Sequence, residues 1–219
     1  MGDERRQLGM RPWRTRCFVM RHPGGGFVVV IGPDGVGKTT LASRILERWD
    51  GPTGYFHFLP TRRSPILPRP ESDPPPPPAK SARDGSRTLG WARLGRNLIR
   101  FWWAYGTQVQ PLVRSGTLVI GDRWAYGYVG QPYALRFYGP LWLADLTERL
   151  LPRPDLVIDM KAPVEVIAAR KQELTPSEIQ SELARWSQVA RGRRAELDAV
   201  LGPDELAEQA IRMIREAIA

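Results

Sequence analysis

The residues best suited to chemistry in this chain lie at positions 32–39, which read Gly-Pro-Asp-Gly-Val-Gly-Lys-Thr and fit the pattern G-x-x-x-x-G-K-[ST] without a mismatch. Glycines let such a loop turn tightly and bring backbone N–H groups onto phosphate oxygens at a helix N-terminus. In this pattern the lysine reaches the β- and γ-phosphates of a nucleotide, and the threonine hydroxyl ligates Mg²⁺. We therefore predict a site for ATP and Mg²⁺ made by Gly32, Asp34, Gly35, Val36, Gly37, Lys38, Thr39 and Thr40.

The elements on either side of this loop are those that the motif requires. Residues 28–31 are a short β-branched run, which predicts a buried strand. After the loop, apolar residues recur at helical spacing at Leu41, Ile45, Leu46 and Trp49. An ordinary glycine-rich turn is the alternative, and the strand–loop–helix context favours the phosphate-binding interpretation.

Composition bounds the class of protein. A chain of 219 residues with 42% hydrophobic and 25% charged residues is typical of one globular α/β domain. No run approaches the roughly 18 apolar residues of a membrane span, so none is predicted. The single cysteine, Cys17, excludes an intrachain disulfide and is compatible with a reducing compartment, which makes a cytoplasmic location the default expectation.

The net charge of +9 is unevenly distributed. Residues 1–26 contain six arginines against Asp3 and Glu4, and we predict a basic disordered arm that precedes a single domain at 27–219. Such an arm is compatible with nucleic-acid binding. The anionic substrates of a kinase, with their phosphates, are sufficient to account for the arginines, so nucleic acid is not the partner that we favour.

A proline-rich insertion is expected at about 60–88. Nine of the 21 prolines lie between residues 60 and 78, and such a run forms neither a helix nor a central strand. A ligand for a proline-binding module is one interpretation. A surface loop or linker is the interpretation that we favour.

The remaining pattern alternates strands with helices. Strands are expected at 55–59, 117–121, 155–160 and 197–201, and helices at 89–115, 133–151, 163–171, from 176 onward and at 204–218. The helix at 89–115 is expected to pack on the sheet, with a membrane-surface helix as the alternative, through an apolar stripe of Trp91, Leu94, Leu98, Trp102, Tyr105 and Val109. The alternation predicts one doubly wound, mostly parallel sheet with helices on both faces.

Three blocks resemble thymidylate kinases of the P-loop nucleoside monophosphate kinase superfamily. The loop carries an acidic residue, Asp34, as theirs does, and residues 111–124 resemble that family's strand ending in Asp-Arg-Tyr, here Asp122-Arg123-Trp124. Residues 154–159, followed by 163–165 and Arg170, resemble its fourth strand and the entry to its lid. The resemblance implies the P-loop kinase fold, with a five-stranded parallel sheet and a lid near 170–177.

The resemblance also implies roles. Asp34 would contact the acceptor's sugar and Arg123 its phosphate, while Asp122 would lie near the metal or the transferred group. Arg170 would be the lid cation. The implied reaction is transfer of the γ-phosphoryl of ATP to a nucleoside monophosphate, dTMP being favoured. Family members are often homodimers, and the tryptophan-rich helix would supply the surface.

Two regions depart from the family pattern. After the second strand, residues 57–62 replace an Arg-Glu-Pro-like signature, and Arg62 is the candidate to supply the missing arginine at the acceptor. At residues 127–133 the polar groups that read a thymine edge are not evident. Because sites built to hydrogen-bond a substrate discriminate strongly, a kinase of the same fold acting on a sugar or glycan end is a second interpretation.

A third interpretation is a P-loop nucleic-acid-binding or regulatory ATPase, and a fourth is a non-catalytic nucleotide sensor. The complete set of Lys38, Thr39, Asp122 and Arg123 favours a catalyst. Other polar residues have plainer explanations: His57 as a packed strand residue, Asp159 as a strand-end hydrogen-bond partner, and a solvated helix face for Arg185, Arg191, Arg193 and Arg194.

Overall fold

Five parallel strands form the centre of the molecule, in the order β2-β3-β1-β4-β5. This computed structural model describes residues 24–61, 65–68, 87–135, 137–170, 175–189 and 192–219. The strands are β1 (Gly26–Ile31), β2 (Thr53–His57), β3 (Leu118–Asp122), β4 (Leu156–Lys161) and β5 (Arg194–Asp198). The predicted α/β class with a five-stranded parallel sheet is confirmed, and Gly26, expected at the end of the arm, already belongs to β1.

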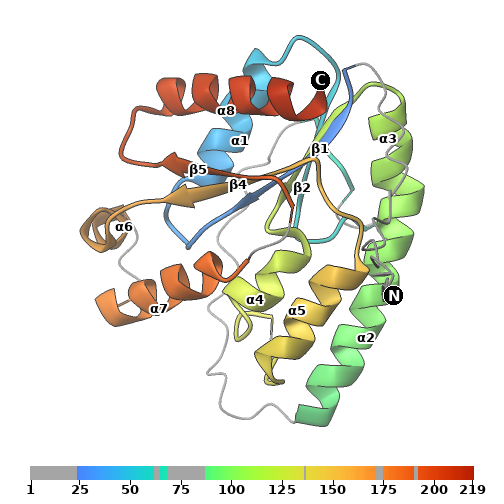
Figure 1. Ribbon diagram of the computed structural model, residues 1–219, viewed down its shortest axis with the longest axis vertical. Coiled ribbons are helices and arrows are strands. Elements are labelled where there is room, and N and C mark those ends of the chain that lie inside the picture. The colour runs from blue at the N-terminus through green and yellow to red at the C-terminus, as the bar shows by residue number, and fades with distance from the viewer. Residues whose placement is uncertain (1–23, 62–64, 69–86, 136, 171–174, 190–191) are drawn as a thin grey trace, which may run out of the picture.

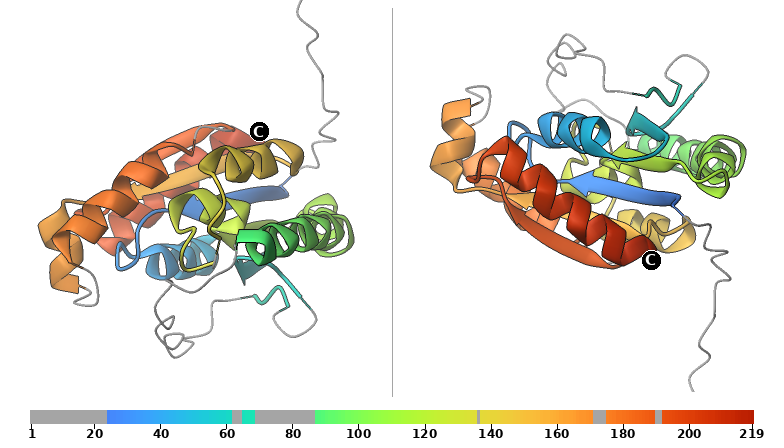
Figure 2. Two further views of the ribbon diagram at one scale, coloured as in Figure 1. Left: turned by 90° about the horizontal axis from the view of Figure 1, so that it is seen from below. Right: turned by 90° about the horizontal axis from the view of Figure 1, so that it is seen from above.

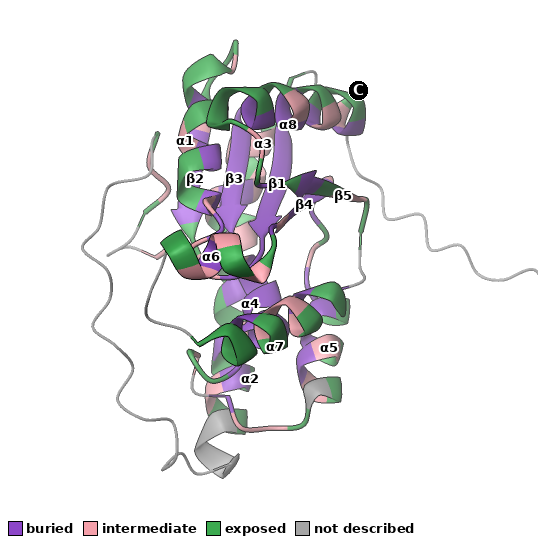
Figure 3. Ribbon diagram, turned by 90° about the vertical axis from the view of Figure 1, so that its left-hand side faces the viewer, coloured by how far each residue is buried: buried purple, intermediate pink, exposed green. Residues whose placement is uncertain are grey.

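The central strand β1 is buried along its whole length. Its side chains alternate between two apolar clusters, with Val28 and Val30 on one face and Phe27, Val29 and Ile31 on the other. A parallel strand covered on both faces needs apolar residues at every position, which is why this segment reads as a continuous hydrophobic run. Figure 3 shows the same pattern, with β1 and β3 buried and β5 partly exposed.

Helices cover both faces of the sheet (Figure 1). One face carries α1 (Lys38–Arg48) and α8 (Pro203–Ile218), and the other carries α2 (Arg87–Ala104), the π-helix η2 (Tyr105–Val109), α3 (Gln110–Arg114), the 3-10 helix η3 (Trp124–Tyr126), α4 (Gly127–Gly130) and α5 (Leu141–Leu150). Helices α6 (Val164–Arg170) and α7 (Pro176–Ser187) lie at the opposite end of the molecule from α2 and α3 (Figure 2). The predicted start of α7 is confirmed, because Thr175 and Glu178 form a reciprocal capping box.

The two edge strands begin earlier than the sequence predicts. Strand β2 starts at Thr53 rather than at residue 55 and ends before Phe58, whose φ of 57° turns the chain out of the sheet. Strand β5 starts at Arg194 rather than at residue 197, and residues 199–201 form a turn. Edge strands are only partly covered, so their sequences lack the apolar run that identifies a central strand.

The helix predicted at 133–151 is shorter in the structure, because α5 begins only at Leu141. Pro140 precedes it with an extended ψ of 143°. A proline lacks the N–H that an interior helical position donates, and it disfavours helical dihedrals at the residue before it, here Gly139. The described residues of the segment 131–140 therefore connect α4 to α5 without a regular helix.

The apolar stripe of α2 is rotated from the predicted one. Leu94, Phe101 and Ala104 are buried together with Val109, whereas Trp91 and Trp102 are about half exposed, at 50% and 51%. The five-residue step from Ala104 to Val109 coincides with the π-helix η2, in which hydrogen bonds span one residue more than in an α-helix. The helix does pack on the sheet, but through a different set of positions.

Part of the proline-rich insertion meets the sheet. Leu67 forms an antiparallel bridge with Tyr55 at the free edge of β2. Arg62, Lys171 with the rest of 171–174, most of the prolines and residues 1–23 of the arm lie outside the described residues. Among the helices that the structure describes, none is long and apolar enough to cross a membrane.

Candidate active site at the carboxyl edge of the sheet

The glycine-rich loop at residues 32–37 follows β1 and leads into α1. Gly32 has a φ of 140°, and a Cβ there would lie 2.7 Å from the carbonyl oxygen of Met160, so only glycine fits. Gly37, with a φ of 105°, is the N-cap of α1 and makes no side-chain cap hydrogen bond. The first N–H groups of α1, at the positive end of the helix dipole, are therefore available to an anion.

Lys38 lies within this loop and is only 6% exposed. Its Nζ donates hydrogen bonds to the carbonyl oxygens of Gly32, at 3.0 Å, and Pro33, at 2.8 Å, and lies 3.6 Å from Oδ1 of Asp34. Burial, together with the nearby charge of Arg123, lowers the pKa of Lys38 from its ordinary value. The loop thus holds a desolvated ammonium group at its centre.

The turn after β3 lies beside this loop because β3 pairs with β1, in a register that places Val30 opposite Asp122. The N–H of Arg123 donates to the carbonyl of Val30 at 2.9 Å. Arg123 and Trp124 both have positive φ, 69° and 46°, which is strained for residues with a side chain. The buried ring of Trp124 packs edge-on against Phe101, and we expect this packing to hold the turn in place.

Asp34 and Arg123, which the resemblance assigns to the acceptor, contact each other. A guanidinium nitrogen of Arg123 donates to Oδ1 of Asp34 in an ion pair. The backbone N–H of Asp34 donates to Oε2 of Glu182 on α7, at 3.4 Å, and Glu182 also accepts from the amide of Gln131. Burial, with Asp34 nearby, raises the pKa of Glu182. The structure therefore places Asp34, Lys38 and Arg123 in one charged cluster.

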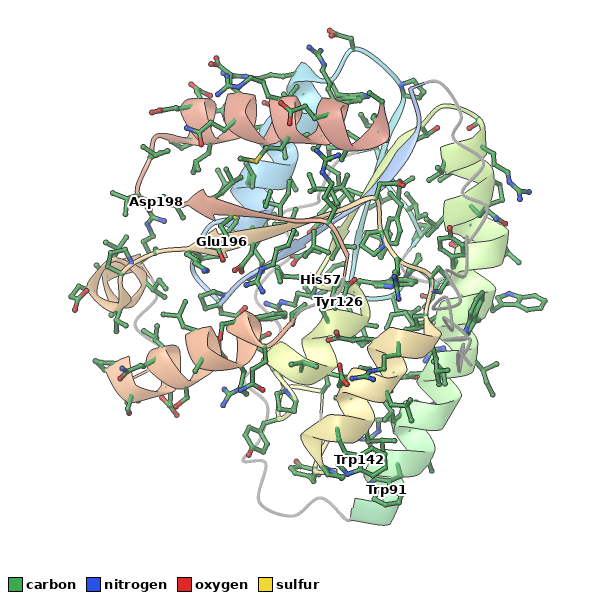
Figure 4. The ribbon with its side chains drawn as sticks, viewed as in Figure 1. His57, Trp91, Tyr126, Trp142, Glu196 and Asp198 are labelled. Atoms are coloured by element: carbon green, nitrogen blue, oxygen red, sulfur yellow. The ribbon has the colours of Figure 1, made fainter. Side chains whose placement is uncertain are left out.

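Asp122 lies at the floor of this cluster with a side chain that is 5% exposed. Its Oδ2 accepts from the hydroxyl of Tyr55 at 3.3 Å and pairs with Nδ1 of His57 at 3.2 Å. Burial alone would raise the pKa of Asp122, but the hydrogen bond from His57 and the charges of Lys38 and Arg123 outweigh it and lower that pKa to about 2. Figure 4 shows His57 where the strands approach α4.

The second oxygen of Asp122 has a different environment. Oδ1 is buried, has no hydrogen-bond partner among the described residues, and lies 4.0 Å from Nε of Arg123. Thr39, in the first turn of α1, has an exposed position and is a hydrogen-bond partner of Tyr55.

No group of three or more His, Cys, Asp or Glu side chains that would hold a metal by itself occurs in the described chain. Magnesium commonly uses one or two protein oxygens together with water and substrate phosphates, so Asp122 and Thr39 fit that ion.

Arg170 lies on another side of the loop. Its guanidinium donates to the carbonyls of Val36, at 3.3 Å, and Ala199, at 3.1 Å, so it joins the loop to the turn before α8. It borders a cavity of about 340 Å³, mostly apolar, which is lined by Gly35, Val36, Gly37, Thr40, Leu41, Met160, Arg170, Ala199, Leu201, Pro203 and Leu206.

Sequence reasoning missed four members of this cluster and misplaced two other residues. Tyr55 and His57 reach Asp122 only through the β2–β3 register. Glu182 reaches Asp34, and Gln131 reaches Glu182, only through the packing of α7 against α4. One feature of the sequence could have identified a partner of Asp122: His57 is a polar residue near the end of the strand that pairs with β3.

Arg193 and Arg194, interpreted as part of a solvated helix face, lie outside the helices. Arg193 is in the bend before β5, and Arg194 lies on β5 and forms an ion pair with the buried Asp159. It also donates to the carbonyls of Val189 and Ser187 at the end of α7, so its role is structural.

The arrangement suits the binding of a polyanion followed by transfer of a charged group. The N-terminal N–H groups of α1, a buried ammonium and a guanidinium converge on one edge of the sheet, beside a carboxylate of which one oxygen has no hydrogen-bond partner in the described part of the chain. In open α/β sheets, ligands bind at this carboxyl edge. No model of a known protein family matches this chain, and a search of the curated proteins finds no match either.

Proposed function

We propose that this protein is an ATP- and Mg²⁺-dependent phosphotransferase that moves the γ-phosphoryl group of ATP to a nucleoside monophosphate, with dTMP the favoured acceptor. The observation that carries the proposal is the convergence of Lys38, Asp122 and Arg123 around the glycine-rich loop. Phosphoryl transfer depends mainly on positioning and on stabilising charge, and these residues supply both.

The donor nucleotide would occupy the loop and the neighbouring cavity. The N–H groups of the loop and of the first turn of α1 bind the phosphates, and Lys38 exchanges its carbonyl partners for β- and γ-oxygens. The cavity of about 340 Å³ beside Val36 and Leu206 has the apolar lining that suits a nucleobase. Arg170 closes one side of that cavity.

The acceptor would be bound on the other side of the loop. Arg123 pairs with Asp34 in the structure, and an acceptor phosphate competes for its guanidinium, while the carboxylate of Asp34 accepts a hydrogen bond from a sugar hydroxyl. Thr39 and Oδ1 of Asp122 would hold Mg²⁺ directly or through its water. When bound, this ion neutralises charge on the β- and γ-phosphate oxygens.

The test is the release of ADP from ATP and Mg²⁺ in the presence of dTMP, other nucleoside monophosphates, nucleosides and sugars. Lys38→Ala is the blank, and we expect it to lower kcat by a factor on the order of 10² or more. Lys161→Ala is the matched control, because this partly exposed lysine pairs with Glu196 on the edge strand. It should keep the wild-type rate.

The outcomes separate the interpretations. Turnover with dTMP above the Lys38→Ala blank supports the proposal as stated. Turnover with sugars alone, with ATP binding intact, identifies the same chemistry on a non-nucleotide acceptor. If ATP is hydrolysed only when nucleic acid is added, and deletion of residues 1–23 abolishes this, the protein is a nucleic-acid-dependent ATPase.

A further inference from the structure

Two side chains of β2 converge on a single oxygen of Asp122. The β2–β3 register places Tyr55 opposite Ile120 and His57 opposite Asp122. Residues two apart along a strand point to the same face, so both β2 side chains lie on the face from which Asp122 projects. Their hydroxyl and Nδ1 lie 3.3 Å and 3.2 Å from Oδ2.

This arrangement treats the two carboxylate oxygens unequally. Oδ2 has both partners, whereas Oδ1 is buried without a hydrogen-bond partner in the described chain and lies on the side of Arg123. The hydroxyl of Tyr55 also contacts Thr39, the other oxygen donor expected at the metal. Tyr55 therefore touches both residues that the proposed reaction requires to be oriented.

We infer that Tyr55 and His57 are positioning residues for phosphoryl transfer, which hold Oδ2 of Asp122 so that Oδ1 is presented to the reacting groups. This inference rests on the proposed function. When a residue that hydrogen-bonds to a metal-ligating carboxylate and orients it is removed, metal affinity or activity commonly falls by about 10- to 100-fold. We assign both residues a role through the groups that they contact, Asp122 for His57, and Asp122 and Thr39 for Tyr55.

The role of His57 requires one tautomer. An ionised carboxylate only accepts hydrogen bonds, so Nδ1 must carry the proton that points at Oδ2. The side chain of His57 is 52% exposed, and in the neutral ring Nε2 is left without a proton.

A pair of isosteric substitutions isolates this hydrogen bond. An asparagine amide nitrogen takes roughly the place of Nδ1, whereas a glutamine amide reaches the place of Nε2. We expect His57→Gln to lower kcat by about tenfold or more, with the KM for ATP unchanged, and His57→Asn to restore most of the loss. Tyr55→Phe should resemble His57→Gln. Tyr105→Phe is the matched control, because Tyr105 packs against Phe27 in the π-helix region of the α2 face and contacts neither Asp122 nor Thr39 in the structure.

Two readouts do not depend on turnover. In the nucleotide-free protein, the ring nitrogen shifts of His57 should report a proton on Nδ1. Calorimetric titration with ADP should show that His57→Gln and Tyr55→Phe reduce the gain in affinity that Mg²⁺ confers. Their affinity for ADP without Mg²⁺ should match that of the wild type.

The inference is overturned if Nδ1 of His57 carries no proton, if Asn and Gln at position 57 behave alike, or if the Mg²⁺-dependent affinity is unchanged in both variants. Failure of the proposed function has a different signature. In that case the wild type lacks turnover with every acceptor, while the histidine tautomer and the effect of Mg²⁺ on ADP binding are still measurable.

Discussion

The guanidinium of Arg123 and the carboxylate of Asp34 form an ion pair that joins the turn after β3 to the loop after β1. Both side chains are partly buried, at 21% and 26% exposed. The pair neutralises the arginine that the resemblance assigns to the acceptor phosphate. An acceptor anion must therefore compete with Asp34 for Arg123. A substitution in this pair should consequently change how the acceptor binds.

Replacing Arg123 by alanine should lower kcat/KM for the acceptor by a factor on the order of 10², because the guanidinium that binds the acceptor phosphate is lost. ATP affinity should change little, since Lys38 and the loop N–H groups remain. Arg149→Ala is the control, as Arg149 forms an exposed pair with Asp145 on α5. Steady-state kinetics and ATP binding measure the two effects. An equal loss of kcat/KM in Arg123→Ala and Arg149→Ala contradicts the role of Arg123 in binding the acceptor.

Acid should destabilise the wild type more than Asp122→Asn. The pKa of Asp122 is lowered from 3.8 to about 2 on folding, so its ionised form contributes stability that is fully present above the unfolded pKa. That contribution, about 2 kcal/mol, is lost as the pH falls toward the folded pKa. Urea unfolding between about pH 5 and pH 2 should show the difference in free energy between the two proteins narrowing. If the difference in unfolding free energy stays constant over this pH range, the pKa of Asp122 is not lowered on folding.

Arg194→Met should destabilise the fold by about 3 kcal/mol, because the carboxylate of Asp159, 2% exposed, then keeps only its longer ion pair with Lys161, at 3.9 Å. The double variant with Asp159→Leu should recover much of that loss, since no buried charge remains. Chemical denaturation of the single and double variants measures the coupling. If the double variant loses as much stability as the two single variants together, Arg194 and Asp159 do not act as a unit.

A homodimer is expected through the apolar surface of α2 and α5. Ile99 and Trp103 are each 72% exposed and Trp142 is 62% exposed, and exposed apolar groups of this size mark interaction surfaces. In Figure 4, Trp91 and Trp142 lie at the same end of these two helices. Sedimentation at micromolar concentration should give a dimer mass for the wild type and a monomer mass for Trp103→Glu. Arg149→Glu, a charge change on α5, is the control. A monomeric wild type rules the dimer out.

Local patterns sufficed for the central elements. The glycine-rich loop, β1, α1 and the Asp-Arg pair that ends β3 were predicted within a residue or two, because each depends on the character of neighbouring residues. A strand covered on both faces must be apolar throughout, and a loop that turns with positive φ must contain glycine. The parallel sheet with helices on both faces follows from the alternation of such patterns.

The composition of the charged cluster was decided by tertiary structure. His57 lies 65 residues before Asp122, and Glu182 lies 148 residues after Asp34, so only the order of the strands and the packing of α7 bring each pair together. The same holds for the edge strands and for the π-helix that rotates the buried stripe of α2. Sequence periodicity reports which face of an element is buried, but which side chains meet depends on neighbours supplied from distant parts of the chain.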